Sequence, residues 1–225
     1  MYEVSIVVVS EGDAAICRRF LNGFKRYVRL PQSVTIVYKS DLAPEPLREL
    51  PFEVHQVVVA PEATYAECLS AALPTLPTDI VLLLDERLLI TPDLVNDVRH
   101  FVYRTRGVVC ARVYDLPPEI QSMIPDFDYL DSVVKARPML PRIQERELQL
   151  QRDTAFFSAQ CCGMPTAVLR RVLPSLGRDQ QLAFGHFEQL PEHERPLLYL
   201  SGAKTYLYPE VAPVVRVALS AALVA

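Results

Sequence analysis

Asp85, Glu86 and Arg87 directly follow the apolar run of residues 80–84, so a charged triplet closes a hydrophobic segment. In open parallel sheets, ligands bind beyond the carboxyl ends of the strands, where loops lead into helices. An acid at such a strand end can hold a metal ion or a sugar hydroxyl. The alternative interpretation is an ordinary solvated acid, and both interpretations stay open at this point.

A second group of ionisable residues lies between residues 186 and 194, where Glu188 and Glu192 stand near two histidines. A carboxylate there could act as a general base. The spacing matches no familiar metal site, and Pro191 and Pro196 would disrupt a helix across this stretch. The alternative interpretation is a solvated acidic loop.

The elements that must position these residues are short strands and amphipathic helices. The apolar runs are near-continuous, which is typical of strands buried on both faces of a parallel sheet. Between them, apolar residues recur with helical spacing, and this alternation predicts an α/β, doubly wound fold with helices flanking a mostly parallel sheet. The predicted strands are residues 4–9, 34–38, 54–60, 80–84, 108–114, 156–162 and 204–208, and the main predicted helices are residues 16–24, 65–73, 91–102 and 165–176.

Composition excludes several classes of function. The net charge of -4 argues against a dedicated nucleic-acid binder, which needs clustered Lys and Arg. The 5 cysteines are scattered, which disfavours a secreted disulfide framework. No apolar run approaches the roughly 20 residues of a membrane-spanning helix. With no recognisable signal peptide, the sequence predicts a cytoplasmic protein.

Four segments, in order, resemble family 2 glycosyltransferases, whose GT-A fold is a Rossmann-like α/β domain. The segment from Val4 to Ser10 is similar to the family's opening strand, and residues 84–93 are similar to its Asp-x-Asp strand end with the following Pro-Asp. Residues 160–177 resemble the acceptor-side strand and its Arg-Arg helix. Residues 197–210 resemble the late helix–Gly–strand–Pro element.

The resemblance implies transfer of a sugar from a nucleoside-diphosphate sugar to an acceptor hydroxyl. It implies a nucleotide-sugar site at Ser10, Glu11, Tyr38, Asp85 and Arg87. A divalent cation, Mg²⁺ or Mn²⁺, would bind Asp85 and neutralise the departing diphosphate. A carboxylate near the acceptor would take its proton, and Glu188 and Glu192 are the candidates.

The sequence departs from the family pattern at several of these positions. Arg87 stands where the second motif acid belongs, and a guanidinium repels a cation but can itself bind a diphosphate. Tyr38 lies near the usual base-binding acid and either stacks on a base or faces solvent. The family's late His is absent. These departures leave open an alternative function, a catalytically degenerate GT-A-like domain that acts as a binding or scaffold protein.

The resemblance implies that residues 1–210 form one GT-A-like domain with two halves. Residues 1–115 would form the nucleotide-binding half and residues 116–210 the acceptor-side half. Residues 116–141 are rich in proline and are either a surface excursion or a substrate-facing lid. The apolar segment 211–225 would pack, form a homo-oligomer contact, or be the root of a longer anchor.

Overall fold

The fold is that of a computed structural model, which describes residues 3–12, 14–27, 33–41, 50–90, 94–115, 160–177, 182, 184–187, 190–191 and 197–207. The described strands form one 8-stranded sheet with the order β3-β2-β1-β4-β7-β6-β8-β5. Its first four strands in that order are parallel, and antiparallel pairs join the remainder through β7 and β5. This arrangement confirms the predicted α/β fold with a mostly parallel sheet.

The amino-terminal half alternates strands and helices. The strands β1 (Ser5–Ser10), β2 (Ser33–Lys39) and β4 (Ile80–Asp85) are almost entirely buried, as their continuous apolar runs predict. The edge position of β3 (Glu53–Val59) explains why most of its residues are only partly buried. The helices of this half are α1 (Ala14–Tyr27) and α2 (Tyr65–Ala72), followed by the short 3₁₀ helix η1 (Leu73–Thr75).

The described chain after β4 adds strands of both directions. After the two-residue strand β5 (Leu88–Leu89) come α3 (Leu94–Thr105) and β6 (Val108–Asp115). The strand β7 (Cys161–Pro165) inserts between β4 and β6, antiparallel to both. The remaining elements are α7 (Thr166–Val172), η3 (Leu173–Ser175), η4 (Phe184–His186) and β8 (Leu197–Leu207), the last parallel to β6.

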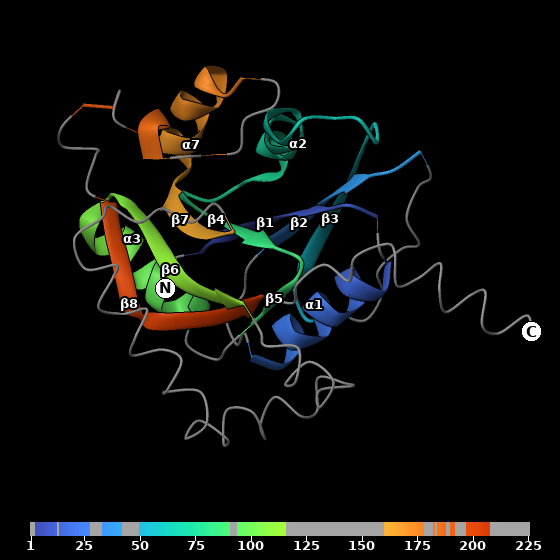
Figure 1. The fold of residues 1–225 in the computed structure, drawn as a ribbon, viewed down its shortest axis with the longest axis horizontal. Coiled ribbons are helices and arrows are strands. Elements are labelled where there is room, and N and C mark those ends of the chain that lie inside the picture. Colours follow the sequence, from blue (N-terminus) through green and yellow to red (C-terminus); the bar gives the residue numbers. More distant parts are fainter. Residues whose placement is uncertain are drawn as a thin grey trace, which may run out of the picture.

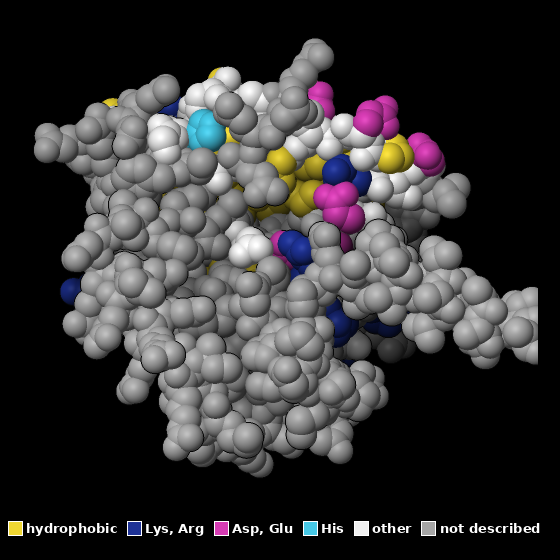
Figure 2. Space-filling view, in the orientation of Figure 1, with side chains coloured by type: hydrophobic (Ala, Val, Ile, Leu, Met, Phe, Trp, Pro, Cys, Tyr) yellow, Lys and Arg dark blue, Asp and Glu magenta, His cyan; other side chains and the backbone are white. Residues whose placement is uncertain are grey.

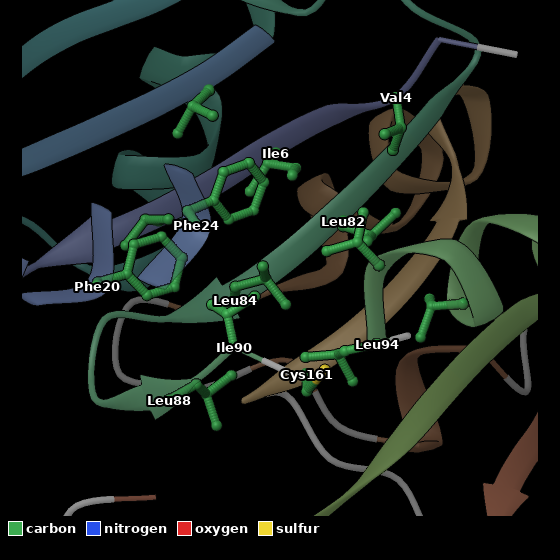
Figure 3. Packing of buried hydrophobic residues seen from close by; sticks show 14 of the residues in the cluster. Val4, Ile6, Phe20, Phe24, Leu82, Leu84, Leu88, Ile90, Leu94 and Cys161 are labelled. Carbon is green, nitrogen blue, oxygen red and sulfur yellow. The ribbon is translucent and has the colours of Figure 1, made fainter. Parts of the chain in front are cut away.

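Helices cover both faces of the sheet (Figure 1). One face packs on α1 and α3 through a core in which Phe20, Phe24 and Leu94 are fully buried (Figure 3). The other face packs on α2 and α7 through a second core that includes Leu69 and Leu169. Burial of both faces of the central strands directs attention to their carboxyl ends, where loops lead into helices.

Two sequence-based predictions about elements are wrong, and one strand was not predicted. The strand predicted over residues 156–162 instead begins at Cys161, after a turn at Gln160. The late helix implied at residues 197–199 is the start of β8, because this apolar triplet pairs with β6. The strand β5 was not predicted, since two residues carry no periodicity and its pairing with β8 is non-local.

Several predictions fall outside the described residues. These include the loop or lid of residues 116–141, most of the acceptor-side half at residues 116–210, and the apolar segment 211–225. In the described part of the chain, no helix is long and apolar enough to cross a membrane.

Candidate functional site

The carboxyl ends of β1, β2 and β4 bring most of the predicted site residues to one edge of the sheet. The strand register places Tyr38 opposite Ser10 and Asp85 opposite Val9. Because parallel strands end at the same edge, the loops after these strands converge there. Ser10, Glu11, Tyr38, Asp85 and Arg87 are therefore near one another in the fold, as their positions at strand ends predict.

The carboxylate of Asp85 is held by Arg87. The Arg87 Nε donates to Asp85 Oδ1 at 2.9 Å, and a terminal guanidinium nitrogen donates to Oδ2 at 2.6 Å. The backbone amide of Arg87 also donates to Oδ1, at 2.8 Å. The Arg87 and Asp85 side chains are 24% and 18% exposed, so the pair is accessible from solvent but screened less than a surface pair. This is a bidentate, charge-assisted contact with both carboxylate oxygens engaged.

Glu86 links the turn after β4 to the loop after β1. Its side chain is only 5% exposed, and its Oε1 accepts a hydrogen bond from the backbone amide of Glu11 at 3.1 Å. Glu11 in turn pairs with Lys39, whose Nζ lies 3.0 Å from Glu11 Oε2 and 3.2 Å from Oε1. A continuous chain of polar contacts therefore runs from the end of β2, across the end of β1, to the end of β4.

The loop after β1 turns sharply at Gly12. Its φ of 92° lies in the region that favours glycine, and its amide donates to the Ser10 hydroxyl at 3.3 Å. A Cβ at this position would lie 3.5 Å from the carbonyl oxygen of Lys39, so the two strand ends approach each other closely. Ser10 thus shapes the loop that carries Glu11.

Tyr38 lies beneath this edge. Its residue exposure is 7%, so the expectation that it faces solvent is wrong. Its hydroxyl contacts Cys17 Sγ at 3.5 Å and accepts from Gln56 Nε2 at 3.4 Å. Burial, together with the Cys17 contact, raises the pKa of Tyr38 well above its usual range. Stacking of Tyr38 on a nucleotide base would require the ring to leave this cluster.

Two residues of this region were missed by sequence reasoning. Lys39 is not among the predicted site residues, although its ammonium group pairs with Glu11. Tyr65 was assigned to the apolar face of a helix. It is the first residue of α2, whose amino end is fixed by a capping box between Thr64 and Glu67. The position of Tyr65 directly after a strand-end loop was the signal available in the sequence.

Tyr65 lies within electrostatic reach of Asp85. Burial raises the pKa of Tyr65 above its usual range, and the nearby Cys162 and the negative charge of Asp85 raise it further. Tyr65 packs on the same core as Val9, Val59 and Ala63. On the face shown in Figure 2, acidic and basic side chains lie side by side next to a recess in which hydrophobic side chains are visible.

The residues present do not fit a divalent cation. Mg²⁺ and Mn²⁺ take oxygen ligands, and both oxygens of Asp85 already accept from Arg87. The second position of the motif supplies a positive charge in place of a ligand. Within the described residues, no group of three or more His, Cys, Asp or Glu side chains is arranged to hold a metal ion. Glu188 and Glu192 lie outside the described residues.

Comparison with known proteins gives matches to solved structures. No protein-family model matches the sequence, and no curated protein matches it significantly. A structure of S. aureus TarS residues 1–349 aligns with 92% of this chain and 60% of its own, at 14% identity and a TM-score of 0.58. A longer TarS structure aligns over 92% of this chain and 37% of its own, at 13% identity and a TM-score of 0.58.

A third similar structure is the mannosyltransferase PcManGT from Pyrobaculum calidifontis in complex with GDP-Man and Mn²⁺. It aligns with 93% of this chain and 58% of its own, at 12% identity and a TM-score of 0.60. The chain thus spans less than two thirds of the length of each of these proteins. Likeness at this level of identity establishes the fold, and this chain has the GT-A glycosyltransferase fold.

Proposed function

We propose that the protein is a family 2 glycosyltransferase that transfers a sugar from a nucleoside-diphosphate sugar to an acceptor hydroxyl. The observation that carries the proposal is the position of Asp85 and Arg87 at the carboxyl end of β4, in a chain with the GT-A fold. The mannosyltransferase of similar fold forms a complex with GDP-Man, a nucleotide sugar. Because fold alone does not decide function, the proposal rests on the charged residues at the strand ends.

The reaction requires a site that stabilises negative charge on the leaving group. The acceptor oxygen forms a bond to the anomeric carbon while the bond between that carbon and the diphosphate oxygen breaks. The electron pair leaves with the nucleoside diphosphate, and a base takes the proton of the acceptor hydroxyl. Arg87 and Lys39 supply positive charge at the edge of the sheet, and we assign the base to Glu188 or Glu192.

Asp85 acts in this scheme through Arg87. Its carboxylate fixes the guanidinium by two side-chain hydrogen bonds, and the backbone contact of Arg87 restrains the same turn. A positioned guanidinium loses less conformational entropy when it binds an anion than a mobile one does. We therefore treat Asp85 as a positioning residue for the donor diphosphate.

The test is ligand binding by the whole chain, measured by calorimetry and by the shift in melting temperature with UDP, GDP and their sugars. A ligand that binds the folded state raises the melting temperature. We expect saturable stabilisation that differs between uracil and guanine nucleotides. When the sugar is transferred, the nucleoside diphosphate should be released.

The matched variants are Asp85→Asn and Asp79→Asn, at opposite ends of the β4 region. Asp79 is exposed at the amino end, far along the strand from the site. Asp85→Asn should weaken nucleotide binding by about tenfold or more, and Asp79→Asn should leave it unchanged. No binding to any nucleotide, or equal effects of the two variants, would contradict the proposal.

A further inference from the structure

The Asp85–Arg87 pair is formed by local geometry at the end of β4. The two residues are separated by one position, and the backbone amide of Arg87 bonds to the same carboxylate as its side chain. The turn leads directly into β5, whose residue Leu88 is 1% exposed and anchors the chain in the core. The guanidinium is therefore held by a turn that the core itself fixes.

This geometry places a positive charge where the motif would otherwise hold a cation. A divalent ion at Asp85 would compete with the guanidinium for a carboxylate whose two oxygens both accept hydrogen bonds from Arg87. The arriving ion would then also meet the repulsion of Arg87 at short range. The site thus favours the positive charge of the Arg87 guanidinium and disfavours a bound metal ion.

A second cation, Lys39, ends β2, which β1 separates from β4 in the sheet. Lys39 is held by Glu11, and the Glu11 backbone is held by Glu86, the residue between Asp85 and Arg87. The two cations are therefore joined by one chain of contacts and belong to one edge of the sheet. Two cations at the same edge of the sheet favour an anionic ligand such as a diphosphate.

We propose that Arg87 takes the place of the divalent cation, so that a nucleoside diphosphate binds at this edge without a metal. This inference rests on the proposed function, because it concerns the ligand of the same site. It specifies that the diphosphate meets the Arg87 guanidinium directly. The donor affinity should then depend on Arg87 and be the same in Mn²⁺ and in EDTA.

The experiment measures the binding of UDP and GDP by calorimetry, with Mn²⁺ or with EDTA, for the wild type and three variants. The wild type should bind its preferred nucleotide equally under both conditions. Arg87→Ala should weaken binding by roughly 10- to 100-fold under both conditions, as expected for loss of a charged hydrogen-bonding partner. Arg87→Asp, which supplies a second carboxylate, should bind only when Mn²⁺ is present.

The matched control is Arg104→Ala, which removes an exposed arginine from the last turn of α3 and should leave the affinity unchanged. The electron paramagnetic resonance signal of Mn²⁺ gives an independent readout. Wild-type protein should leave the signal of the aqueous ion unaltered, whereas Arg87→Asp should reduce it. Melting temperatures measured without ligand identify any variant that fails to fold.

The outcomes separate this inference from the proposed function. Nucleotide binding by the wild type that requires Mn²⁺, or that survives Arg87→Ala, overturns the role of Arg87 and leaves the glycosyltransferase proposal standing. The wild-type metal comparison alone decides this if the variants do not fold. No nucleotide binding under either condition overturns the proposed function and this inference together.

Discussion

The backbone amide of Glu11 donates a hydrogen bond to the buried carboxylate of Glu86 at 3.1 Å, which ties the loop after β1 to the turn after β4. The two residues are far apart in sequence, and neither lies within a helix or strand. The contact therefore holds the two strand-end loops in a fixed position relative to each other. Burial is the main cause of the raised pKa of Cys17 and of Tyr38, and the negative charge of Glu86 raises both further.

Removal of this contact should destabilise the protein. Glu86→Ala leaves a cavity and an amide without its acceptor, and we expect the free energy of unfolding to fall by about 1–3 kcal/mol. Urea denaturation followed by circular dichroism measures the change. Glu62→Ala, at an exposed position, should alter the stability by less than about 0.5 kcal/mol. Equal effects of the two substitutions would contradict a structural role for Glu86.

The Lys39–Glu11 pair should affect ligand affinity more than stability. Lys39 is 21% exposed and Glu11 69%, and ion pairs of this exposure contribute little to folding. Lys39→Ala should weaken nucleoside diphosphate binding by roughly three- to tenfold, and added salt should diminish the difference. Glu11→Gln should not weaken binding, because it leaves Lys39 in place and removes a competing negative charge.

Calorimetric titrations at low and high salt measure both effects. Lys25→Ala, an exposed position on α1, is the control for removal of a lysine. Tighter binding by Lys39→Ala, or loss of binding in Glu11→Gln, would show that this pair does not act through positive charge toward the ligand.

Gly163 is required for the packing of β7 against α3. A Cβ at this position would lie 2.6 Å from Val98 Cγ1 and 3.1 Å from Val102 Cγ2, closer than packed atoms approach. Gly163→Ala should lower the free energy of unfolding by about 1–3 kcal/mol, as overpacking does. Chemical denaturation of the variant measures this loss.

A second substitution tests the cause of that loss. Val98→Ala removes the nearest methyl group, so the double variant should be less destabilised than the sum of the two single variants. Gly185→Ala is the matched control, because a Cβ there meets nothing within 4 Å. Strict additivity at Gly163 and Val98 would mean that the two side chains do not compete for the same space.

Stability should fall in alkaline solution because of the buried thiols. Burial raises the pKa of Cys161 and Cys162 well above the value of 9.0 for an unperturbed thiol. Above about pH 9 the unfolded chain loses these protons while the folded chain keeps them, so the unfolded state is favoured as the pH rises. The raised pKa of Tyr38 and of Tyr65 adds to the effect near pH 10.0.

Denaturation midpoints between about pH 7 and pH 10 measure this dependence. The same burial keeps the thiols protonated and inaccessible, so a thiol reagent should label Cys161 and Cys162 only after denaturant is added. Rapid labelling of either residue in the folded protein, or a stability that is independent of pH in this range, would contradict the burial of these groups.

The sequence predicts the central strands well because their signal is local. The apolar runs of β1, β2 and β4 are continuous, since both faces of each strand are covered by helices. The boundaries of β7 and β8 could not be predicted in the same way. Gly163 and Pro165 are weak strand formers, and their strand is fixed by pairing with β4 and β6.

The candidate site was predictable in its location but not in its contacts. Asp85 ends a buried strand, and the carboxyl edge of a parallel sheet is a general ligand position. The pairing of Arg87 with Asp85 depends on the turn into β5, and the pairing of Lys39 with Glu11 depends on the neighbouring strand. Neither contact follows from residue spacing alone. Glu188 and Glu192 stay predictions because they lie outside the described residues.

The most direct test of binding at Arg87 is a crystal structure of the whole chain with a nucleoside diphosphate, grown in the presence of Mn²⁺. We predict that the diphosphate lies at the carboxyl edge of β4, within hydrogen-bonding distance of the Arg87 guanidinium, with Asp85 still paired to Arg87. A diphosphate bound elsewhere, or a Mn²⁺ ion on the Asp85 carboxylate with Arg87 displaced, would contradict it.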